Sequence, residues 1–114
     1  MKKASLLPGV FLFLAGSFQG LAADAVRGKE IFMRAGCYQC HGTLGQGANT
    51  GPKLAPQPLP LESLIAFVRN AATTAMPAYS ANLVSDAEMA DLHAYLSSIG
   101  PPPQRKDVPL LNNP

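Results

Sequence analysis

The sequence predicts a small all-α domain built on three main helices. Three stretches, residues 24–36, 60–70 and 85–99, place apolar side chains on one face at helical spacing. No stretch shows the alternation of apolar and polar residues that is typical of a half-buried strand. Between the first two helices, residues 42–59 are rich in glycine and proline and have few side chains with which to build a core. An ordered domain of this kind needs something other than its own loops to pack around.

The first predicted helix, residues 24–36, presents small and apolar residues on one face: Gly28, Ile31, Phe32 and Ala35. A glycine inside a helix costs about 1 kcal/mol relative to alanine. We expect the close approach of another helix to offset this cost at Gly28, because glycine has no side chain to hold that helix away.

The second predicted helix, residues 60–70, opens with Pro60, which suits a first helical turn. Its apolar stripe consists of Leu61, Leu64, Ile65 and Val68. The third helix has the clearest boundaries, because Ser85 and Glu88 match a capping box and Gly100 is followed by three prolines. Its stripe, beside which Tyr95 lies, consists of Met89, Leu92, Leu96 and Ile99.

Residues 1–22 have the layout of a secretory signal peptide. Lys2 and Lys3 form the charged region, residues 4–16 form the apolar region, and small residues surround positions 20–23. The apolar region is interrupted by proline and glycine, and it is shorter than the roughly 20 residues that span a bilayer. We therefore expect export to the periplasm and no stable membrane anchor after cleavage.

Cleavage is expected after Ala22, with Ala23 as the close alternative. One small domain, residues 23–100, would remain, followed by a proline-rich C-terminal tail, residues 101–114. We expect this tail to be extended or disordered, as proline-rich segments usually are.

The formal charge of +2 lies entirely in the predicted signal peptide. Of the nine lysine and arginine residues, Lys2 and Lys3 belong to it, so the remainder has seven basic and seven acidic residues. A nucleic-acid partner would require a basic face, and strong electrostatic steering would require an excess of one charge. The sequence predicts neither.

Both cysteines and one of the two histidines lie in the stretch CYQCH, residues 37–41. A disulfide between Cys37 and Cys40 would close a very small ring, stabilise little and leave His41 unexplained. A structural zinc site needs four ligands, and only His93 remains as a further histidine. A thioredoxin-like dithiol stands near a strand of a βαβ fold, and no strand is predicted here.

Covalent attachment of one haem c explains all three residues together. The thiols of Cys37 and Cys40 would add to the two vinyl groups of the porphyrin, and the adjacent His41 would become the fifth iron ligand. The haem would then supply the core that the glycine- and proline-rich segment lacks.

Four side chains are candidates for the sixth ligand: Met33, Met76, Met89 and His93. Met33 precedes Cys37 by only four residues and would struggle to reach the opposite haem face. Met89 lies on the apolar stripe of the third helix, where a core side chain is the simpler interpretation. His93 lies on the more polar face of that helix, and we expect it to be solvated.

Met76 stands apart from these candidates because it lies outside any helical pattern. Pro77 stiffens the chain beside it, and Met76 lies 35 residues beyond His41, far enough to pass around the edge of a porphyrin. Met76 is therefore the predicted sixth ligand, in keeping with the His/Met pairs of cytochromes c.

Four stretches together resemble the small, exported, single-haem class I cytochromes c of bacteria. They are CYQCHG at 37–42, GPKL at 51–54, MPAY at 76–79 and LVSDAEMADLHAYL at 83–96. The resemblance covers about residues 24–99. It implies a cytochrome c-like fold, in which three main helices wrap around one covalently bound haem.

The resemblance also implies roles for single residues. The Pro52 carbonyl would accept a hydrogen bond from the ring of His41 and fix its orientation. Leu54 would pack on the haem face, and Tyr79 would help to hold the loop of Met76. Gly28 and Phe32 would cross the third helix near Leu92 and Tyr95. The chain lacks the lysine ring of mitochondrial-type carriers, so recognition of a partner by strong charge attraction is in doubt.

Two filled axial positions leave the iron no vacant site for a substrate. The sequence therefore predicts an electron carrier of the periplasm rather than an enzyme. Its partners would be redox proteins, with an exported dehydrogenase as donor and a respiratory acceptor or oxidase. Two alternatives are a haem c subunit tightly bound to an exported dehydrogenase, and a gas-binding or peroxidase-like protein with an open iron site.

Overall fold

The computed structural model describes residues 22–71 and 75–112. The predicted signal peptide, residues 1–22, lies outside these residues except for its last position. Within the described chain, four α-helices and two short 3-10 helices follow one another: α1 (Ala25–Arg34), α2 (Tyr38–His41), α3 (Leu61–Arg69), α4 (Asp86–Ser98), η1 (Arg105–Asp107) and η2 (Pro109–Leu111). The described part contains no strand, only an isolated bridge between Ala48 and Gly51. The prediction of an all-α fold is confirmed.

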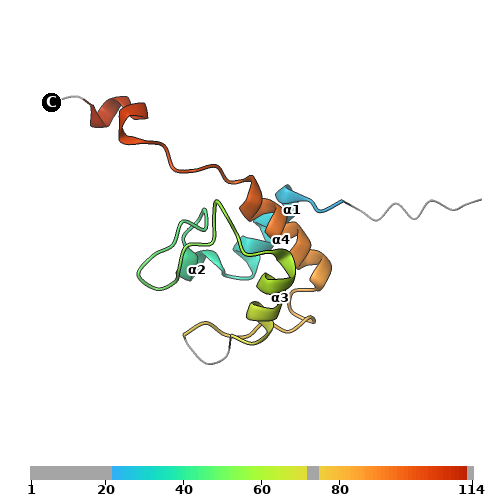
Figure 1. Cartoon of the computed structure of the whole chain (residues 1–114). Coiled ribbons are helices and arrows are strands. Elements are labelled where there is room, and N and C mark those ends of the chain that lie inside the picture. The colour runs from blue at the N-terminus through green and yellow to red at the C-terminus, as the bar shows by residue number, and fades with distance from the viewer. Residues whose placement is uncertain (1–21, 72–74, 113–114) are drawn as a thin grey trace, which may run out of the picture.

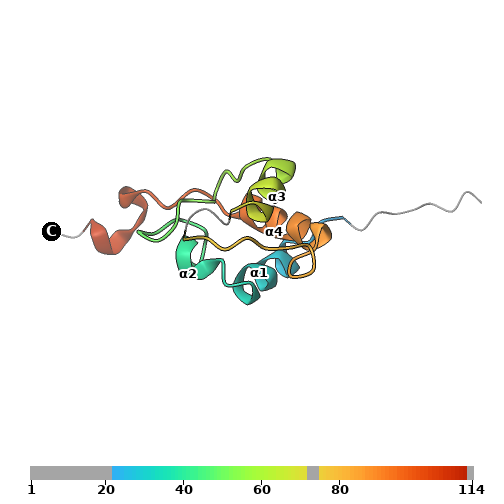
Figure 2. The ribbon, with the colours of Figure 1, turned by 90° about the horizontal axis from the view of Figure 1, so that it is seen from below.

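Helix α4 lies between α1 and α3 and packs against both, as the two perpendicular views of Figures 1 and 2 show. The apolar stripes predicted from the sequence meet at these contacts. Phe32 of α1 and Met89 and Leu96 of α4 are almost completely buried. The rings of Phe32 and Tyr95 lie 5.6 Å apart in a tilted arrangement, which favours aromatic pairing.

Gly28 makes the close contact between α1 and α4. A Cβ atom at this position would overlap the Asp91 carbonyl oxygen and lie 2.8 Å from the Cβ of Tyr95. Helix α1 also begins against α4, since the Asp24 backbone N–H donates to the buried Asp91 carboxylate at 2.7 Å. The expected crossing of Gly28 and Phe32 over Leu92 and Tyr95 is therefore present.

Helix α4 begins with the capping box expected from its sequence. The Ser85 hydroxyl accepts from the Glu88 N–H at 3.2 Å, and the Ser85 N–H donates to the Glu88 carboxylate at 2.8 Å. Helix α3 begins at Leu61, so Pro60 precedes the helix as its N-cap instead of occupying its first turn. The capping box fixes where α4 enters the packed bundle.

The C-terminal tail leaves α4 and runs away from the helices (Figure 1). The expectation of an extended or disordered tail is wrong for its middle part, which forms η1 and η2. Proline at the first position of η2 has a backbone angle suited to a helical turn, and the Leu111 N–H donates to the Val108 carbonyl at 2.9 Å. Leu110 is 90% exposed, so the turns are held by local hydrogen bonds and little else.

Among the described helices, none combines the length and the apolar composition needed to cross a bilayer.

Candidate haem site

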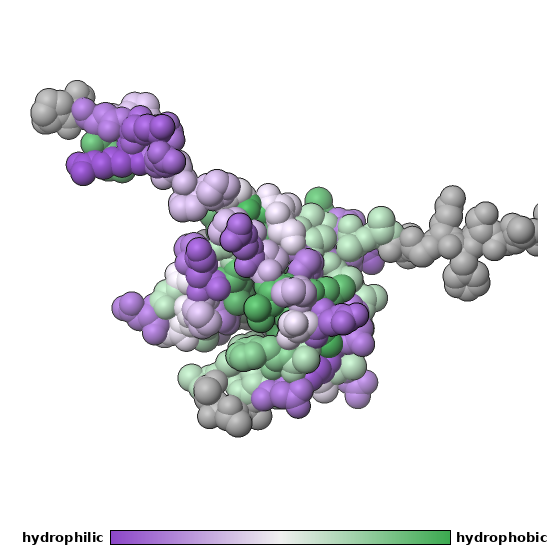
Figure 3. Space-filling view, in the orientation of Figure 1, coloured by the Kyte–Doolittle hydropathy of each residue, from purple (hydrophilic) through white to green (hydrophobic). Residues whose placement is uncertain are grey.

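A largely apolar cavity of about 360 Å³ opens among the four α-helices and the loops between them. Its size falls within the range of cofactor pockets, about 300–1,000 Å³. Figure 3 shows hydrophobic residues gathered at the centre of the face that is also seen in Figure 1, with polar residues around them. All seven site residues predicted from the sequence border this one cavity: Cys37, Cys40, His41, Pro52, Leu54, Met76 and Tyr79.

Helix α2, which was not predicted from the sequence, carries Tyr38–His41 of the CYQCH stretch, with Cys37 as its N-cap. The predicted first helix ends early, at Arg34, in a glycine cap: the Gly36 N–H donates to the Met33 carbonyl at 3.2 Å and the Cys37 N–H donates to that of Phe32 at 3.1 Å. Gly36 has a φ of 79°, a left-handed conformation that glycine adopts without strain. The chain is thereby redirected at once into α2. A glycine at this position is itself a helix-end signal.

The two thiols lie three residues apart, at positions i and i+3, which is about one helical turn. Both Cys37 and Cys40 are free and half-buried, and both border the cavity. Burial raises the pKa of the Cys37 thiol above its ordinary value. A thiol of this kind is largely protonated at neutral pH, unlike the low-pKa thiolate that a redox dithiol uses as its nucleophile.

His41 follows at the end of α2 and is 6% exposed. Its Nδ1 lies 2.7 Å from the Pro52 carbonyl oxygen, which can only accept, so Nδ1 donates this hydrogen bond. In a neutral ring with this orientation, Nε2 is the nitrogen that carries the free lone pair and can ligate a metal. The hydrogen bond that the resemblance implied is thus present.

Gly51 allows the Pro52 carbonyl to come so close. A Cβ atom on Gly51 would lie 2.7 Å from the Cys40 carbonyl oxygen and 3.0 Å from the His41 Nδ1. The segment is fixed from a second side, where the Thr50 hydroxyl donates to the Cys40 carbonyl at 3.1 Å. The orientation of the imidazole is therefore built into the backbone of two adjoining segments.

Leu54 reaches the cavity from the glycine-rich loop. The Gly45 carbonyl accepts hydrogen bonds from the Leu54 N–H at 2.7 Å and from the Ala55 N–H at 3.0 Å. Gly45 itself has a φ of 63°. This loop thus obtains its order from backbone hydrogen bonds at glycine positions, and it can place one leucine on the cavity wall without a helix or strand.

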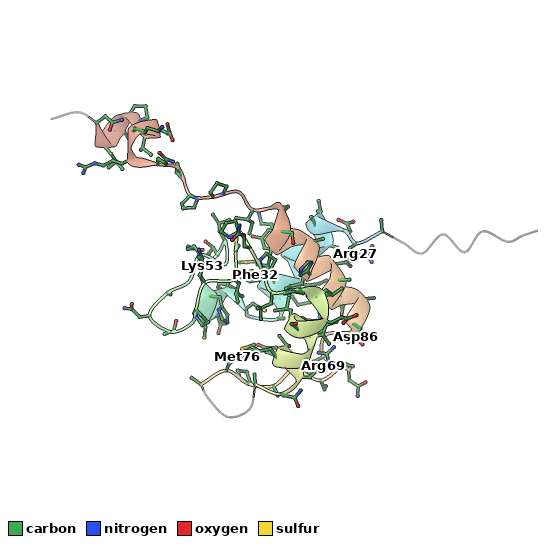
Figure 4. The ribbon with its side chains drawn as sticks, viewed as in Figure 1. Arg27, Phe32, Lys53, Arg69, Met76 and Asp86 are labelled. Carbon is green, nitrogen blue, oxygen red and sulfur yellow. The ribbon has the colours of Figure 1, made fainter. Side chains whose placement is uncertain are left out.

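Met76 borders the cavity from the loop between α3 and α4, and Figure 4 shows it on that loop, below α2 in this view. A second hollow of about 190 Å³ is also bordered by Met76, together with Cys40 and His41. The thioether and the imidazole therefore share the same apolar space, although they lie far apart in the sequence.

Tyr79 fixes the chain just beyond Met76. Its hydroxyl donates to the Ala35 carbonyl at the end of α1 at 2.8 Å, and its N–H donates to the Val68 carbonyl of α3 at 3.0 Å. Burial raises the pKa of the phenol, and the nearby Cys37 and Cys40 raise it further. Tyr79 is thus a hydrogen-bond donor at neutral pH, as a structural link requires.

The three other candidates for the sixth ligand have different surroundings. Met33 is 39% exposed on α1. Met89 is 1% exposed and belongs to the core, although its side chain also borders the cavity. His93 is half-buried, and its Nε2 lies 3.0 Å from the Leu59 carbonyl oxygen. The expectation that His93 is solvated is therefore only partly right.

Several cavity residues were not singled out from the sequence. Phe67 of α3 borders both hollows and is 55% exposed, and Val84 forms part of the wall while being 3% exposed. Phe67 belongs to no motif, and Val84 stands in the stretch 83–96 without a role of its own being expected. Only the three-dimensional arrangement of α3 and the following loop shows that they face the site.

The side chains around the cavity fit haem c. Two thiols one turn apart match two vinyl groups, an oriented imidazole and a thioether match the iron, and apolar walls match the porphyrin. An all-α fold with this arrangement defines a small c-type cytochrome.

Comparison with protein-family models agrees with this class. The family described as cytochrome C oxidase, cbb3-type, subunit III matches residues 23–96, well over half of the chain, and the chain belongs to this family. No curated protein matches the chain, and no solved structure does. Membership in a cytochrome c family implies a covalently bound haem c, an electron-carrying role and redox partner proteins in general.

Proposed function

We propose that this cytochrome carries single electrons in the periplasm on one haem c, held by thioether bonds from Cys37 and Cys40. His41 and Met76 are the proposed axial ligands. One observation carries the proposal: both thiols, the imidazole and the thioether border a single apolar cavity.

When bound, haem c supplies an iron that gains and loses one electron with little change in its ligands. The chain's own residues would orient the iron ligands and limit the access of water. The Pro52 carbonyl holds His41 by its Nδ1–H, the thioether of Met76 would favour the reduced iron, and the apolar walls would limit the access of water to it. With His41 and Met76 both bound to the iron, no position would remain open for a substrate, which favours a carrier over an enzyme.

The location follows from the proposed signal peptide, residues 1–22. In the periplasm, an exported dehydrogenase is the proposed donor. The proposed acceptor is a respiratory protein or oxidase, and the description of the matching family, which names a cbb3-type oxidase subunit, favours an oxidase.

Replacing Met76 with alanine tests the ligand assignment. We expect the reduction potential to fall by on the order of 100 mV or more, because axial ligands set haem potentials over about 0.8 V. The weak far-red sulfur-to-iron band of the ferric protein should disappear. Met33→Ala is the matched control, since it removes a thioether from an exposed position on α1. An unchanged potential in Met76→Ala would eliminate Met76 as the ligand.

The same protein distinguishes the other functions. Ready binding of carbon monoxide by the reduced wild type at neutral pH would favour a gas-binding or peroxidase-like protein. Co-purification with an exported dehydrogenase or with an oxidase would favour a bound subunit over a free carrier.

A further inference from the structure

The loop that carries Met76 is closed at its base by the last turn of α3. The Tyr79 N–H donates to the Val68 carbonyl at 3.0 Å, and the Tyr79 carbonyl accepts from the Arg69 Nη1 at 2.8 Å. Two successive residues of α3 therefore hold both backbone polar groups of Tyr79. This attachment lies three residues beyond Met76.

The other arm of the Arg69 guanidinium continues to α4. Its Nη2 donates to the Val84 carbonyl at 2.8 Å and to the Asp86 carboxylate at 2.7 Å. Val84 borders the cavity and is 3% exposed, whereas Asp86 is the first residue of α4. Figure 4 shows Arg69 and Asp86 beside each other, on the part of the molecule that also carries Met76.

We infer that Arg69 is a positioning residue for the Met76 ligand, an inference that rests on the proposed function. Arginine is always charged and presents five N–H donors in a rigid plane, so one side chain can hold two carbonyls and a carboxylate at once. The Arg69 side chain is 19% exposed, and water therefore competes little for these bonds. Arg69 fixes both ends of the segment 79–84, one end next to the ligand loop and the other on the cavity wall.

The physical consequence concerns how strongly Met76 would compete with other ligands for the sixth position of the iron. A ligand on a tethered loop acts at an effective concentration that depends on how narrowly the loop is confined. Removing the guanidinium frees the Tyr79 and Val84 carbonyls and widens the range of positions open to Met76. The ion pair contributes less, because the Asp86 side chain is 69% exposed and exposed pairs are weak.

Arg34 is the matched control within the same molecule. Its Nη2 lies 2.7 Å from the Glu88 carboxylate, so it also joins a helix to α4 through an arginine–carboxylate pair. That pair connects α1 to the first turn of α4, and in the described part of the chain neither of its two side chains is hydrogen-bonded to Tyr79 or Val84. A variant at Arg34 therefore loses the same charge and the same kind of ion pair while the ligand loop keeps its attachments.

The test uses the ferric holoprotein and free imidazole as a competitor for the sixth position. In Arg69→Leu, we expect imidazole to displace the thioether at concentrations lower by about tenfold or more, because two charge-assisted hydrogen bonds to the loop are lost. The far-red sulfur-to-iron band should be bleached at the same concentrations. Arg69→Gln retains amide donors and should fall between Arg69→Leu and the wild type. Arg34→Leu, Arg34→Gln and Asp86→Asn should stay within about twofold of the wild type.

The outcomes separate this inference from the proposed function. A wild type without the far-red band would overturn both. A wild type with the band, and Arg69 variants that bind imidazole no more readily than the Arg34 variants, would overturn the positioning role alone. Should Arg69→Leu fail to accumulate as holoprotein, the comparison of Arg69→Gln with Arg34→Gln decides by the same criterion. None of these substitutions introduces a residue able to replace Met76 on the iron.

Discussion

The contact of Gly28 with α4 predicts that alanine at this position destabilises the protein. In an isolated helix the change would stabilise by about 1 kcal/mol, since alanine is the better helix former. Here the added Cβ would overlap the Asp91 carbonyl oxygen and lie 2.8 Å from the Tyr95 Cβ. Real Cβ contacts are longer than 3.0 Å, and a backbone carbonyl cannot rotate away as a side chain can. Helices α1 and α4 would have to separate.

Overpacking of this kind costs typically about 1–3 kcal/mol, and a backbone clash belongs at the upper end of that range. After subtraction of the gain in helix propensity, we expect Gly28→Ala to lower the free energy of unfolding by about 2 kcal/mol. Urea unfolding of the holoprotein, followed by helical circular dichroism, measures this difference.

Val26→Ala is the control for Gly28→Ala, because Val26 lies on the same helix and is 73% exposed. It should change the free energy of unfolding by no more than about 0.5 kcal/mol. If Gly28→Ala proved as stable as the wild type or more so, the close crossing of α1 and α4 described above would be refuted.

Two further predictions concern hydrogen bonds outside the α1–α4 crossing. Tyr79→Phe removes the bond from the phenol to the Ala35 carbonyl and should lower the free energy of unfolding by about 1 kcal/mol in urea; no loss would mean that the bond adds nothing. The Ser85 N–H, and secondarily Arg34, hold the pKa of Glu88 below its ordinary value of 4.5, so the native protein binds fewer protons there than the unfolded chain. This stabilisation is complete above pH 4.5 and is lost as the pH falls through the lowered pKa of Glu88. Glu88→Gln should therefore be less stable than the wild type at neutral pH, with a difference that shrinks in acid; a difference independent of pH would contradict the assignment.

The three main helices could be predicted from the sequence because each buries one periodic stripe. Phe32, Leu92 and Leu96, for example, are all at most 5% exposed, as their helical spacing requires. Helix α2 has four residues, too few to show any period, so its existence depends on the Gly36 cap and could be read only from a single glycine. The two turns of the tail were missed for the same reason of length.

The residues of the candidate site also fall into a group that the sequence predicts and a group that it does not. The thiols and His41 are adjacent in sequence, so their joint chemistry can be recognised from five letters. The role of Arg69 could not be recognised, because its partners lie 10, 15 and 17 residues away and two of them are backbone carbonyls. Every residue has a carbonyl, and no sequence pattern marks which of them will accept from a distant arginine.

The packing of the helices and loops explains why some of these residues can be predicted and others cannot. The buried core takes most of its side chains from α1 and α4, whereas α3 and the two long loops add only Leu64, Ala55 and Val84 to it. The loops that border the cavity are held at their margins by polar links, through the Gly45 carbonyl, the Tyr79 phenol and the Arg69 guanidinium. A porphyrin in this cavity would contact the loops as well as α1 and α4, so loosening these links should weaken the proposed hold on the iron before it unfolds the packed α1–α4 pair.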